Sequence, residues 1–144
     1  QIDGFGQQFG KKMMVEAFIE GSELTVSVMG DRPLAVTEII TAQDFYNYDA
    51  KYKENNSRHV VPAKLNKEVY NQALSLAKVA HDSIGCRGVS RADFRYDGTD
   101  LFILEVNTQP GLTPTSLVPE QAAYAGISFE DLVIWMIDNA ECGP

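Results

Sequence analysis

Residues 85–117 read GCRGVSRADFRYDGTDLFILEVNTQPGLTPTSL. Apolar and polar side chains alternate from Cys86 to Asp97 and again from Leu101 to Asn107, on either side of a short polar turn. This pattern is typical of two antiparallel strands joined by a tight turn. We therefore predict that these two stretches form a β-hairpin, and that the rest of the fold is organised around it.

The register of this hairpin follows from the rule that residues directly opposite each other on antiparallel strands point to the same face. Placing Asp93 opposite Glu105 separates an apolar face from a polar one. The apolar pairs are then Ala92 with Val106, Phe94 with Leu104 and Tyr96 with Phe102, and the loop is Gly98, Thr99 and Asp100. The polar face carries Asp93 opposite Glu105 and Arg91 opposite Asn107.

Two like charges directly opposite each other destabilise a sheet, because their Cβ atoms lie only about 5 Å apart. A cation between Asp93 and Glu105 would relieve this repulsion. These carboxylates and the amide oxygen of Asn107 suit a hard cation such as Mg²⁺, which prefers oxygen ligands and completes its shell with water and phosphate. The alternative interpretation is a solvated polar face on which Arg91 neutralises one acid.

The loop at residues 108–117 favours the metal interpretation. It contains two prolines, one glycine and four hydroxyl-bearing side chains, and it leads into an expected helix. Gly111 permits a close approach of the backbone to another group, since it lacks a Cβ atom. Ser116 lies near the helix start, where free backbone N–H groups attract anions.

The run SRADF at 90–94, followed by LEVNTQPGLTPTSLVPEQ at 104–121, resembles the metal-binding and substrate-binding end of D-alanine:D-alanine ligases, which are members of the ATP-grasp superfamily. Further similarity lies in VEAFIEGSELTV at 15–26 and FYNYDAKY at 45–52. The resemblance covers nearly the whole chain. It implies an α+β fold, with an antiparallel sheet covered by helices, as the C-terminal ATP-grasp subdomain.

The resemblance also implies where ATP and metal bind. Asp93, Glu105 and Asn107 would hold Mg²⁺, with Mn²⁺ as an alternative, against the β- and γ-phosphates. Glu23 would hydrogen-bond to the ribose. The residues expected along the adenine are Glu16, Ala17, Phe18 and Ile19.

The other implied site residues bind or activate the amino-acid substrates. Arg91 and the backbone N–H of Gly111 would form an oxyanion hole for the tetrahedral intermediate. Ser116 and Leu117 would receive the carboxylate of the second D-alanine.

Residues 41–64 form the longest stretch in which apolar residues follow no clear period, so a long loop is expected. Long loops in compact domains are often functional lids. By resemblance this is the loop that closes over the active site. Lys51 would reach the transferring phosphate and Tyr52 would face the substrates. A tyrosine in this lid accompanies D-alanine as acceptor in the family, which implies a dipeptide product.

The family activates one D-alanine with ATP as an acyl phosphate, which the amine of a second D-alanine attacks to give D-alanyl-D-alanine for peptidoglycan synthesis. Residues 1–144 resemble only its C-terminal ATP-grasp domain, without the N-terminal and central domains. We therefore expect the chain to be inactive alone and the full-length enzyme to be a homodimer. The alternatives are another ATP-grasp carboxylate–amine ligase and a non-catalytic nucleotide-binding fragment.

Composition and charge argue against several other classes of protein. The net charge of −8 argues against nucleic acid as a partner, because nucleic-acid binders usually carry a basic stripe. No apolar run reaches the length of a membrane span and no signal peptide opens the chain, so a cytoplasmic protein is expected. Two distant cysteines indicate neither a zinc site nor a disulfide framework.

The flanking segments predict the rest of the sheet and its helices. A meander of three strands is expected over residues 13–19, 23–29 and 34–40. Apolar positions at helical spacing predict a helix from Asn66 to Ile84, with Asn66 as its cap. Two shorter helices are expected over 119–125 and, capped by Ser128, over residues 128–140.

Overall fold

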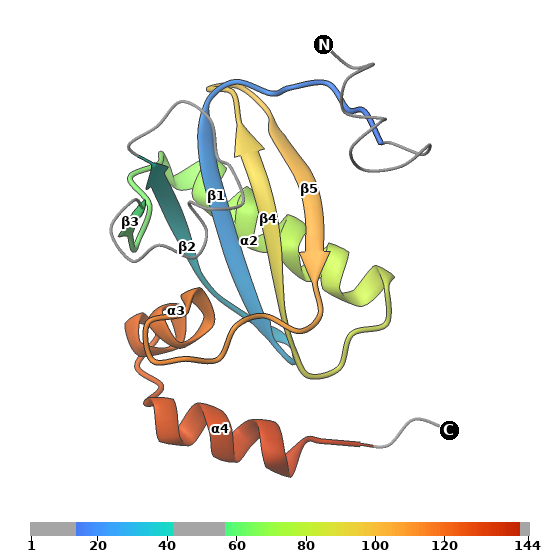
Figure 1. Cartoon of the computed structure of the whole chain (residues 1–144), viewed down its shortest axis with the longest axis vertical. Helices are drawn as coiled ribbons and strands as arrows, with labels where there is room; N and C mark the ends of the chain where they lie inside the picture. The colour runs from blue at the N-terminus through green and yellow to red at the C-terminus, as the bar shows by residue number, and fades with distance from the viewer. Residues whose placement is uncertain (1–13, 42–56, 142–144) are drawn as a thin grey trace, which may run out of the picture.

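The computed structural model describes residues 14–41 and 57–141, which contain a five-stranded antiparallel sheet and three helices (Figure 1). The strand order is β3-β2-β1-β4-β5. The strands are β1 (Ser22–Met29), β2 (Arg32–Thr41), β3 (Ser57–Val60), β4 (Val89–Tyr96) and β5 (Leu101–Asn107); the helices are α2 (Lys67–Ser83), α3 (Leu117–Tyr124) and α4 (Phe129–Asp138). The expected α+β class is confirmed.

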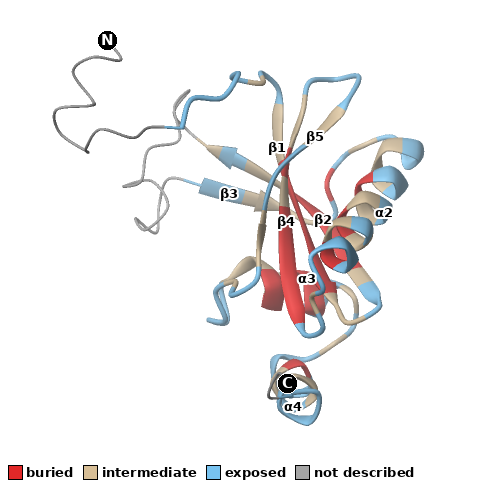
Figure 2. Ribbon diagram, turned by 90° about the vertical axis from the view of Figure 1, so that its right-hand side faces the viewer, coloured by how far each residue is buried: buried red, intermediate tan, exposed pale blue. Residues whose placement is uncertain are grey.

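Helix α2 covers one face of the sheet, and Figure 2 shows it running alongside the most buried strands. Alternate residues of the central strands pack against it, because successive strand side chains point to opposite faces. The buried core on this face consists of Leu24, Val26, Val28, Val36, Ala63, Ala73, Ala77, Ala92 and Phe94. Phe94 and Leu24 are fully buried, so this cluster anchors the two central strands, β1 and β4.

Helices α3 and α4 bury a second cluster, which contains Val118, Ala122 and Leu132 together with Leu34 and Val89 of the sheet. Helix α3 packs against β1 and β2. Val89 lies on the opposite face from Ala92, since the two are three residues apart on one strand. The sheet therefore has α2 on one face and α3 on part of the other.

The hairpin of β4 and β5 has the predicted register at its chemically important end and a different one towards its turn. Arg91 lies opposite Asn107, and Asp93 lies opposite Glu105. Beyond Asp93 the register shifts, so Phe94 pairs with Ile103 and Tyr96 pairs with Leu101. The predicted pairs of Phe94 with Leu104 and Tyr96 with Phe102 are therefore wrong.

A β-bulge at Leu104 is the cause of this difference, because the extra residue moves the side chains of β5 between the turn and the bulge, at residues 101–103, to the other face. Phe102 consequently lies opposite Arg95 on the polar face. Leu104 is 54% exposed rather than part of the core.

Residues 14–20 form no strand, so the expected strand at 13–19 is wrong for the described part. Met14, Val15 and Phe18 are exposed, with 68% of Phe18 accessible. The strands expected at 23–29 and 34–40 are confirmed as β1 and β2. An apolar run is thus present at the start of the chain without being buried in the core.

The predicted helices are confirmed with small shifts at their ends. Asn66 caps α2 by accepting a hydrogen bond from the backbone N–H of Val69 at 2.8 Å. Ser128 caps α4 by accepting one from Asp131 N–H at 3.0 Å. Helix α3 begins at Leu117, two residues before the expected start, and α4 ends at Asp138 rather than near residue 140.

His81 lies near the end of α2 and has only 1% of its surface exposed. Its Nδ1 atom lies 2.7 Å from the hydroxyl of Ser90 on β4. Burial lowers the pKa of the imidazole, and this effect outweighs the opposing influence of the Asp82 carboxylate. His81 therefore links α2 to the sheet as a neutral side chain.

Acid is expected to destabilise the protein through His81, because the unfolded chain binds a proton there more readily than the folded chain. The contribution of His81 is complete above its unfolded pKa of about 6.5 and is lost as the pH falls towards the lower folded pKa. Urea unfolding followed between about pH 7.5 and about pH 5 should show this loss, at no more than about 1.4 kcal/mol per pH unit. A His81→Gln variant should lack this part of the slope, and equal slopes in both proteins would contradict the assignment.

Candidate functional site

The polar side chains of the hairpin lie on the sheet face opposite α2. Thr25 of β1 lies opposite Asp93 of β4, which in turn lies opposite Glu105 of β5. Arg91 and Asn107 form the next pair on the same face. The structure therefore brings together all three predicted metal ligands and Arg91.

Arg91 and Asp93 form a bidentate ion pair in a mostly buried position. Arg91 Nε donates to Asp93 Oδ1 at 2.8 Å and Nη2 donates to Oδ2 at 2.7 Å. Thr25 Oγ1 donates to Asp93 Oδ1 at 2.7 Å. The two charged side chains are 10% and 14% exposed. The structure thus shows the arrangement that the alternative interpretation anticipated, in which Arg91 neutralises one of the two acids.

This donor set still fits a hard cation. An ionised carboxylate offers about four acceptor positions, and three of those on Asp93 are used by Arg91 and Thr25. Glu105 is exposed, and Asn107 uses its Oδ1 to accept from the N–H of Gln109 at 2.9 Å. Oxygen donors on both strands suit Mg²⁺. Over residues 14–41 and 57–141, no cluster of three His, Cys, Asp or Glu side chains offers another metal site.

The loop at 108–117 folds so that two predicted site residues meet. A Cβ atom added to Gly111 would lie 3.0 Å from Ser116 Oγ, which is tighter than most real contacts. Ser116 Oγ also accepts from the N–H of Thr113 at 3.0 Å. The predicted need for glycine at 111 is therefore a close approach, which the structure supports.

Ser116 is the N-cap residue of α3, but its side chain makes no capping hydrogen bond to the helix. The first intrahelical bond is donated by Glu120 to Ser116 O at 3.1 Å, and Pro119 has no N–H to donate. The N–H groups of Leu117 and Val118 are therefore first-turn donors without an intrahelical acceptor. Together with the helix dipole they favour a bound carboxylate.

Gln121 fixes α3 to the sheet, and the sequence pattern alone had pointed to no role for it. Its fully buried side chain accepts from Ser27 N–H at 2.7 Å and donates to Thr25 O at 3.2 Å. Ser27 lies where the register of β1 and β2 shifts, between Val26 and Val28, and Thr25 lies just before this place. The amide therefore satisfies backbone groups at this irregularity and sets the position of the loop that precedes α3.

Replacement of Gln121 by leucine is expected to lower the free energy of unfolding by about 2–3 kcal/mol, because a buried N–H and a buried C=O lose their partner. Urea unfolding at neutral pH measures this loss. Gln72→Leu on the exposed surface of α2 is a matched control that should change stability by no more than about 0.5 kcal/mol. A similar small effect of both substitutions would contradict the structural role of Gln121.

A further side-chain contact joins the end of the expected lid range to α3. His59 Nδ1 on β3 lies 3.1 Å from Glu120 Oε2 on α3. Residues 57–60 of the expected lid are thus a strand, and Thr41 ends β2. Lys51 and Tyr52 lie outside the described residues, so their predicted roles stay predictions.

We call the residues predicted to bind adenine and ribose, 16–19 and Glu23, the nucleotide wall. This predicted nucleotide wall lies at the other end of the polar face from α3. Glu16, Ala17 and Phe18 are exposed and Ile19 is half-buried. They lead through Gly21 into β1, where Glu23 lies opposite Arg95 of β4. Arg95 was not anticipated as a site residue, because its pairing with Glu23 joins strands far apart in the sequence.

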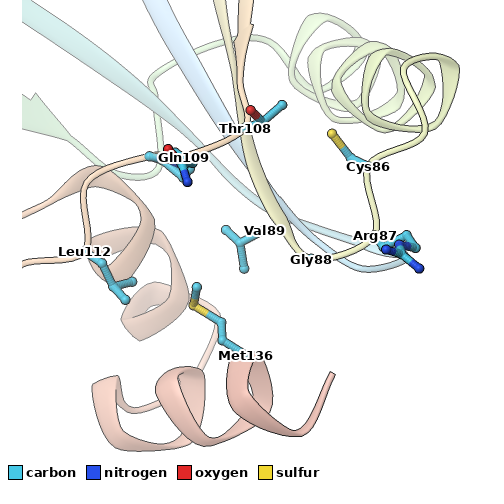
Figure 3. Close-up of a pocket in the computed structure, with 9 residues that line it drawn as sticks. Cys86, Arg87, Gly88, Val89, Thr108, Gln109, Leu112 and Met136 are labelled. Atoms are coloured by element: carbon cyan, nitrogen blue, oxygen red, sulfur yellow. The ribbon is translucent and has the colours of Figure 1, made fainter. Parts of the chain in front are cut away.

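A pocket of about 470 Å³ lies beneath the 108–117 loop, between that loop, the start of β4 and α4 (Figure 3). Cys86, Arg87 and Met136 are among its lining residues. None of the predicted site residues that the structure describes lines it. We therefore place the candidate site on the polar face of the sheet rather than in this pocket.

The chain is similar to proteins of one family. The model of that family, described as D-ala D-ala ligase C-terminus, matches residues 5–138. The D-alanine–D-alanine ligase of Rhodospirillum rubrum is 61% identical over 134 residues, which cover 93% of this chain and 44% of that protein. The one from Gluconobacter oxydans is 60% identical over 137 residues, covering 92% of this chain and 45% of that protein. The chain thus spans less than half the length of these relatives.

Solved structures share the fold. A D-alanine–D-alanine ligase from Bacillus anthracis complexed with ATP matches with a TM-score of 0.71 and 28% identity, covering 85% of this chain and 40% of that one. The VanG D-Ala:D-Ser ligase from Enterococcus faecalis matches with a TM-score of 0.72 and 30% identity, covering 84% and 36%. The ATP-grasp assignment of the fold is therefore confirmed. In the described part of the chain, no helix has the length and hydropathy of a membrane span.

Proposed function

Since this chain belongs to the D-alanine–D-alanine ligase family and matches its C-terminal part, we propose that it supplies the metal, nucleotide and acceptor portion of an ATP-dependent ligase that joins two D-alanines. The observation that carries the proposal is the polar face of β4. Arg95, Asp93 and Arg91 follow one another on this face at every second residue. They run from the nucleotide wall to the loop that leads into α3.

The spacing of these residues suits a nucleotide triphosphate and a substrate laid end to end. Arg91 and Arg95 are four residues apart along a strand, which corresponds to roughly 13 Å. Ile19 and Glu23 lie at the Arg95 end, where adenine and ribose would bind. Asp93 and Glu105 lie at the centre, at the level proposed for the phosphates.

Asp93, Glu105 and Asn107 would hold Mg²⁺ or Mn²⁺. When bound, the metal offsets the repulsion between the phosphates of ATP and the substrate carboxylate. The Asp93 carboxylate that would bind the metal also accepts two hydrogen bonds from Arg91. Arg91 would therefore lie beside the metal site, at the level proposed for the reacting carboxylate.

After the carboxylate of the first D-alanine has taken the γ-phosphoryl group from ATP, attack by the amine of the second D-alanine on the acyl carbon would place negative charge on the former carbonyl oxygen of a tetrahedral intermediate, from which phosphate then leaves. Arg91 and the N–H of Gly111 are the donors that we assign to this oxygen. Ser116 and the N–H of Leu117 would bind the carboxylate of the second D-alanine, which holds its amine towards the acyl group. Lys51 would stabilise the transferring phosphate.

The remaining partners belong to the same proposal. The longer enzyme would act as a homodimer in the cytoplasm, without nucleic acid or membrane partners, and its product would enter peptidoglycan synthesis. Tyr52 would select D-alanine as acceptor. A second candidate, another ATP-grasp ligase with a different acceptor, draws on the similarity to a D-Ala:D-Ser ligase.

A chimera tests the proposal. The part of the Rhodospirillum rubrum ligase that precedes its matched region is fused to this chain, which is 61% identical to the part that it replaces. We expect release of ADP that depends on both D-alanine and Mg²⁺, with D-alanyl-D-alanine as the product. The relative itself is the positive control, and its isolated N-terminal part is the negative control.

Each acceptor is also assayed separately. Faster turnover with D-serine or D-lactate than with D-alanine would overturn the proposed specificity. A folded chimera without ADP release would overturn the ligase proposal. Binding of ATP to the 144-residue chain, measured with and without Mg²⁺, would then show whether it is a non-catalytic nucleotide-binding fragment.

A further inference from the structure

Arg95 contacts three members of the predicted nucleotide wall at once. Its Nε atom donates to Ile19 O at 2.9 Å. Its guanidinium carbon lies 5.5 Å from the centre of the Phe18 ring, a distance typical of cation–π contact. Its Nη1 atom lies 3.9 Å from Glu23 Oε2. One side chain of β4 therefore contacts both the segment before β1 and the start of β1 itself.

The segment at 14–20 forms no helix or strand, and residues 14–18 are exposed. Gly21 brings its end against β4, where an added Cβ atom would lie 2.0 Å from Tyr96 O. Beyond this turn, the direction of the segment is held by the Arg95 hydrogen bond to Ile19 O.

We propose that Arg95 is a positioning residue that holds the segment at 16–19 and the Glu23 carboxylate in the arrangement that receives the base and ribose of ATP. This inference rests on the proposed function. Arg95 would affect ATP binding by holding the nucleotide wall in place, and it would not contact the phosphates. The guanidinium is suited to this task because its planar fork can bond a carbonyl, pair with a carboxylate and stack on an aromatic ring. A lysine has a point charge and cannot do all three.

Preorganisation explains why such a residue matters for binding. A segment without regular structure loses conformational freedom when it closes on a ligand, and this loss weakens binding. Arg95 removes much of that freedom before the nucleotide arrives. Its loss should therefore weaken nucleotide binding while leaving the chemical step unchanged.

The first test measures mobility without any ligand. Backbone ¹⁵N relaxation of the full chain should give order parameters of about 0.8 for residues 17–20 in the wild type and below about 0.6 in Arg95→Met. Arg95→Lys should give intermediate values. Arg87→Met, which removes an exposed arginine paired with Glu141, is the matched control and should leave the segment unchanged. Equal order parameters in wild type and Arg95→Met would overturn the positioning role.

The second test measures nucleotide binding, with ADP and Mg²⁺ as the probe. We expect the Kd of Arg95→Met to rise about 10-fold, with partial recovery in Arg95→Lys. In the chimera the same change should raise KM for ATP about 10-fold and leave kcat within about 2-fold. A mobile segment with unchanged Kd and KM would overturn the inference. If the folded chimera releases no ADP, the proposed function fails, and the order parameters alone decide whether Arg95 positions the segment.

Discussion

The Asp93→Asn variant is expected to lower the free energy of unfolding by about 3 kcal/mol, because it leaves the Arg91 guanidinium without its carboxylate in a mostly buried place. Both Arg91 hydrogen bonds to Asp93 are charge-assisted and shorter than 3 Å. An asparagine can accept only one of them. Urea unfolding at neutral pH, without added metal, measures the change.

The control for this loss is Asp100→Asn, an equivalent substitution at an exposed position of the same hairpin. It should change stability by no more than about 0.5 kcal/mol. A double variant, Arg91→Met with Asp93→Leu, should recover part of the stability lost in Asp93→Asn, because neither charge is then left alone. A loss below about 1 kcal/mol in Asp93→Asn would show that the ion pair is not maintained in solution.

The hairpin was predictable from sequence because its two faces differ so strongly in polarity. That contrast fixed Asp93 opposite Glu105 and Arg91 opposite Asn107, as the structure has them. The bulge at Leu104 was not predictable, since apolar residues stand at 101–104 without interruption and either register keeps some of them in the core. In this hairpin the local pattern therefore predicted the register of the candidate site residues, and it failed where the alternation was lost.

At the start of the chain, the local pattern predicted a strand that the structure does not contain. Met14, Val15 and Phe18 satisfy the pattern of a buried strand, yet they are exposed. Apolar side chains that face a ligand or another protein segment have the same composition as those in a core. Only the resemblance to a ligand-binding segment offers a reason for exposed apolar residues here, and the binding role of Phe18 and Ile19 stays a prediction.

The roles of Gln121 and Arg95 could not be predicted from the sequence, because their partners lie on elements that are distant in the chain. Gln121 bonds to backbone groups at a register shift between β1 and β2. Arg95 depends on the pairing of β1 with β4, which begin more than 60 residues apart in the chain, at Ser22 and Val89. Neither signal is local, so each required the assembled sheet.

The two acids of the site differ in burial, so substitutions at these positions can separate effects on stability from effects on activity. Asp93 is mostly buried and already bonded to Arg91 and Thr25, whereas Glu105 is exposed. A substitution at Asp93 therefore perturbs both the fold and the proposed metal site. Glu105 is the position at which the metal hypothesis is tested without unfolding the protein.

In the chimera, Glu105→Gln is expected to lower kcat about 100- to 1,000-fold, because the metal loses a charged ligand at the centre of the site. The stability of the chain should change by no more than about 0.5 kcal/mol, since the side chain is exposed and glutamine has the same shape. The Mg²⁺ concentration for half-maximal activity should rise at least about 10-fold. The coupled assay for ADP release, run over a range of Mg²⁺, gives both values.

Two comparisons make this result specific to metal binding. Asp100→Asn removes a carboxylate from the loop of the same hairpin, and it should leave both kcat and the Mg²⁺ dependence unchanged. Mn²⁺ should restore part of the activity of Glu105→Gln, because carboxylate, carbonyl and water ligands also suit this ion. An unchanged Mg²⁺ dependence in Glu105→Gln would place the metal elsewhere and leave Arg91, on Asp93, as the cation that offsets the charge of the hairpin.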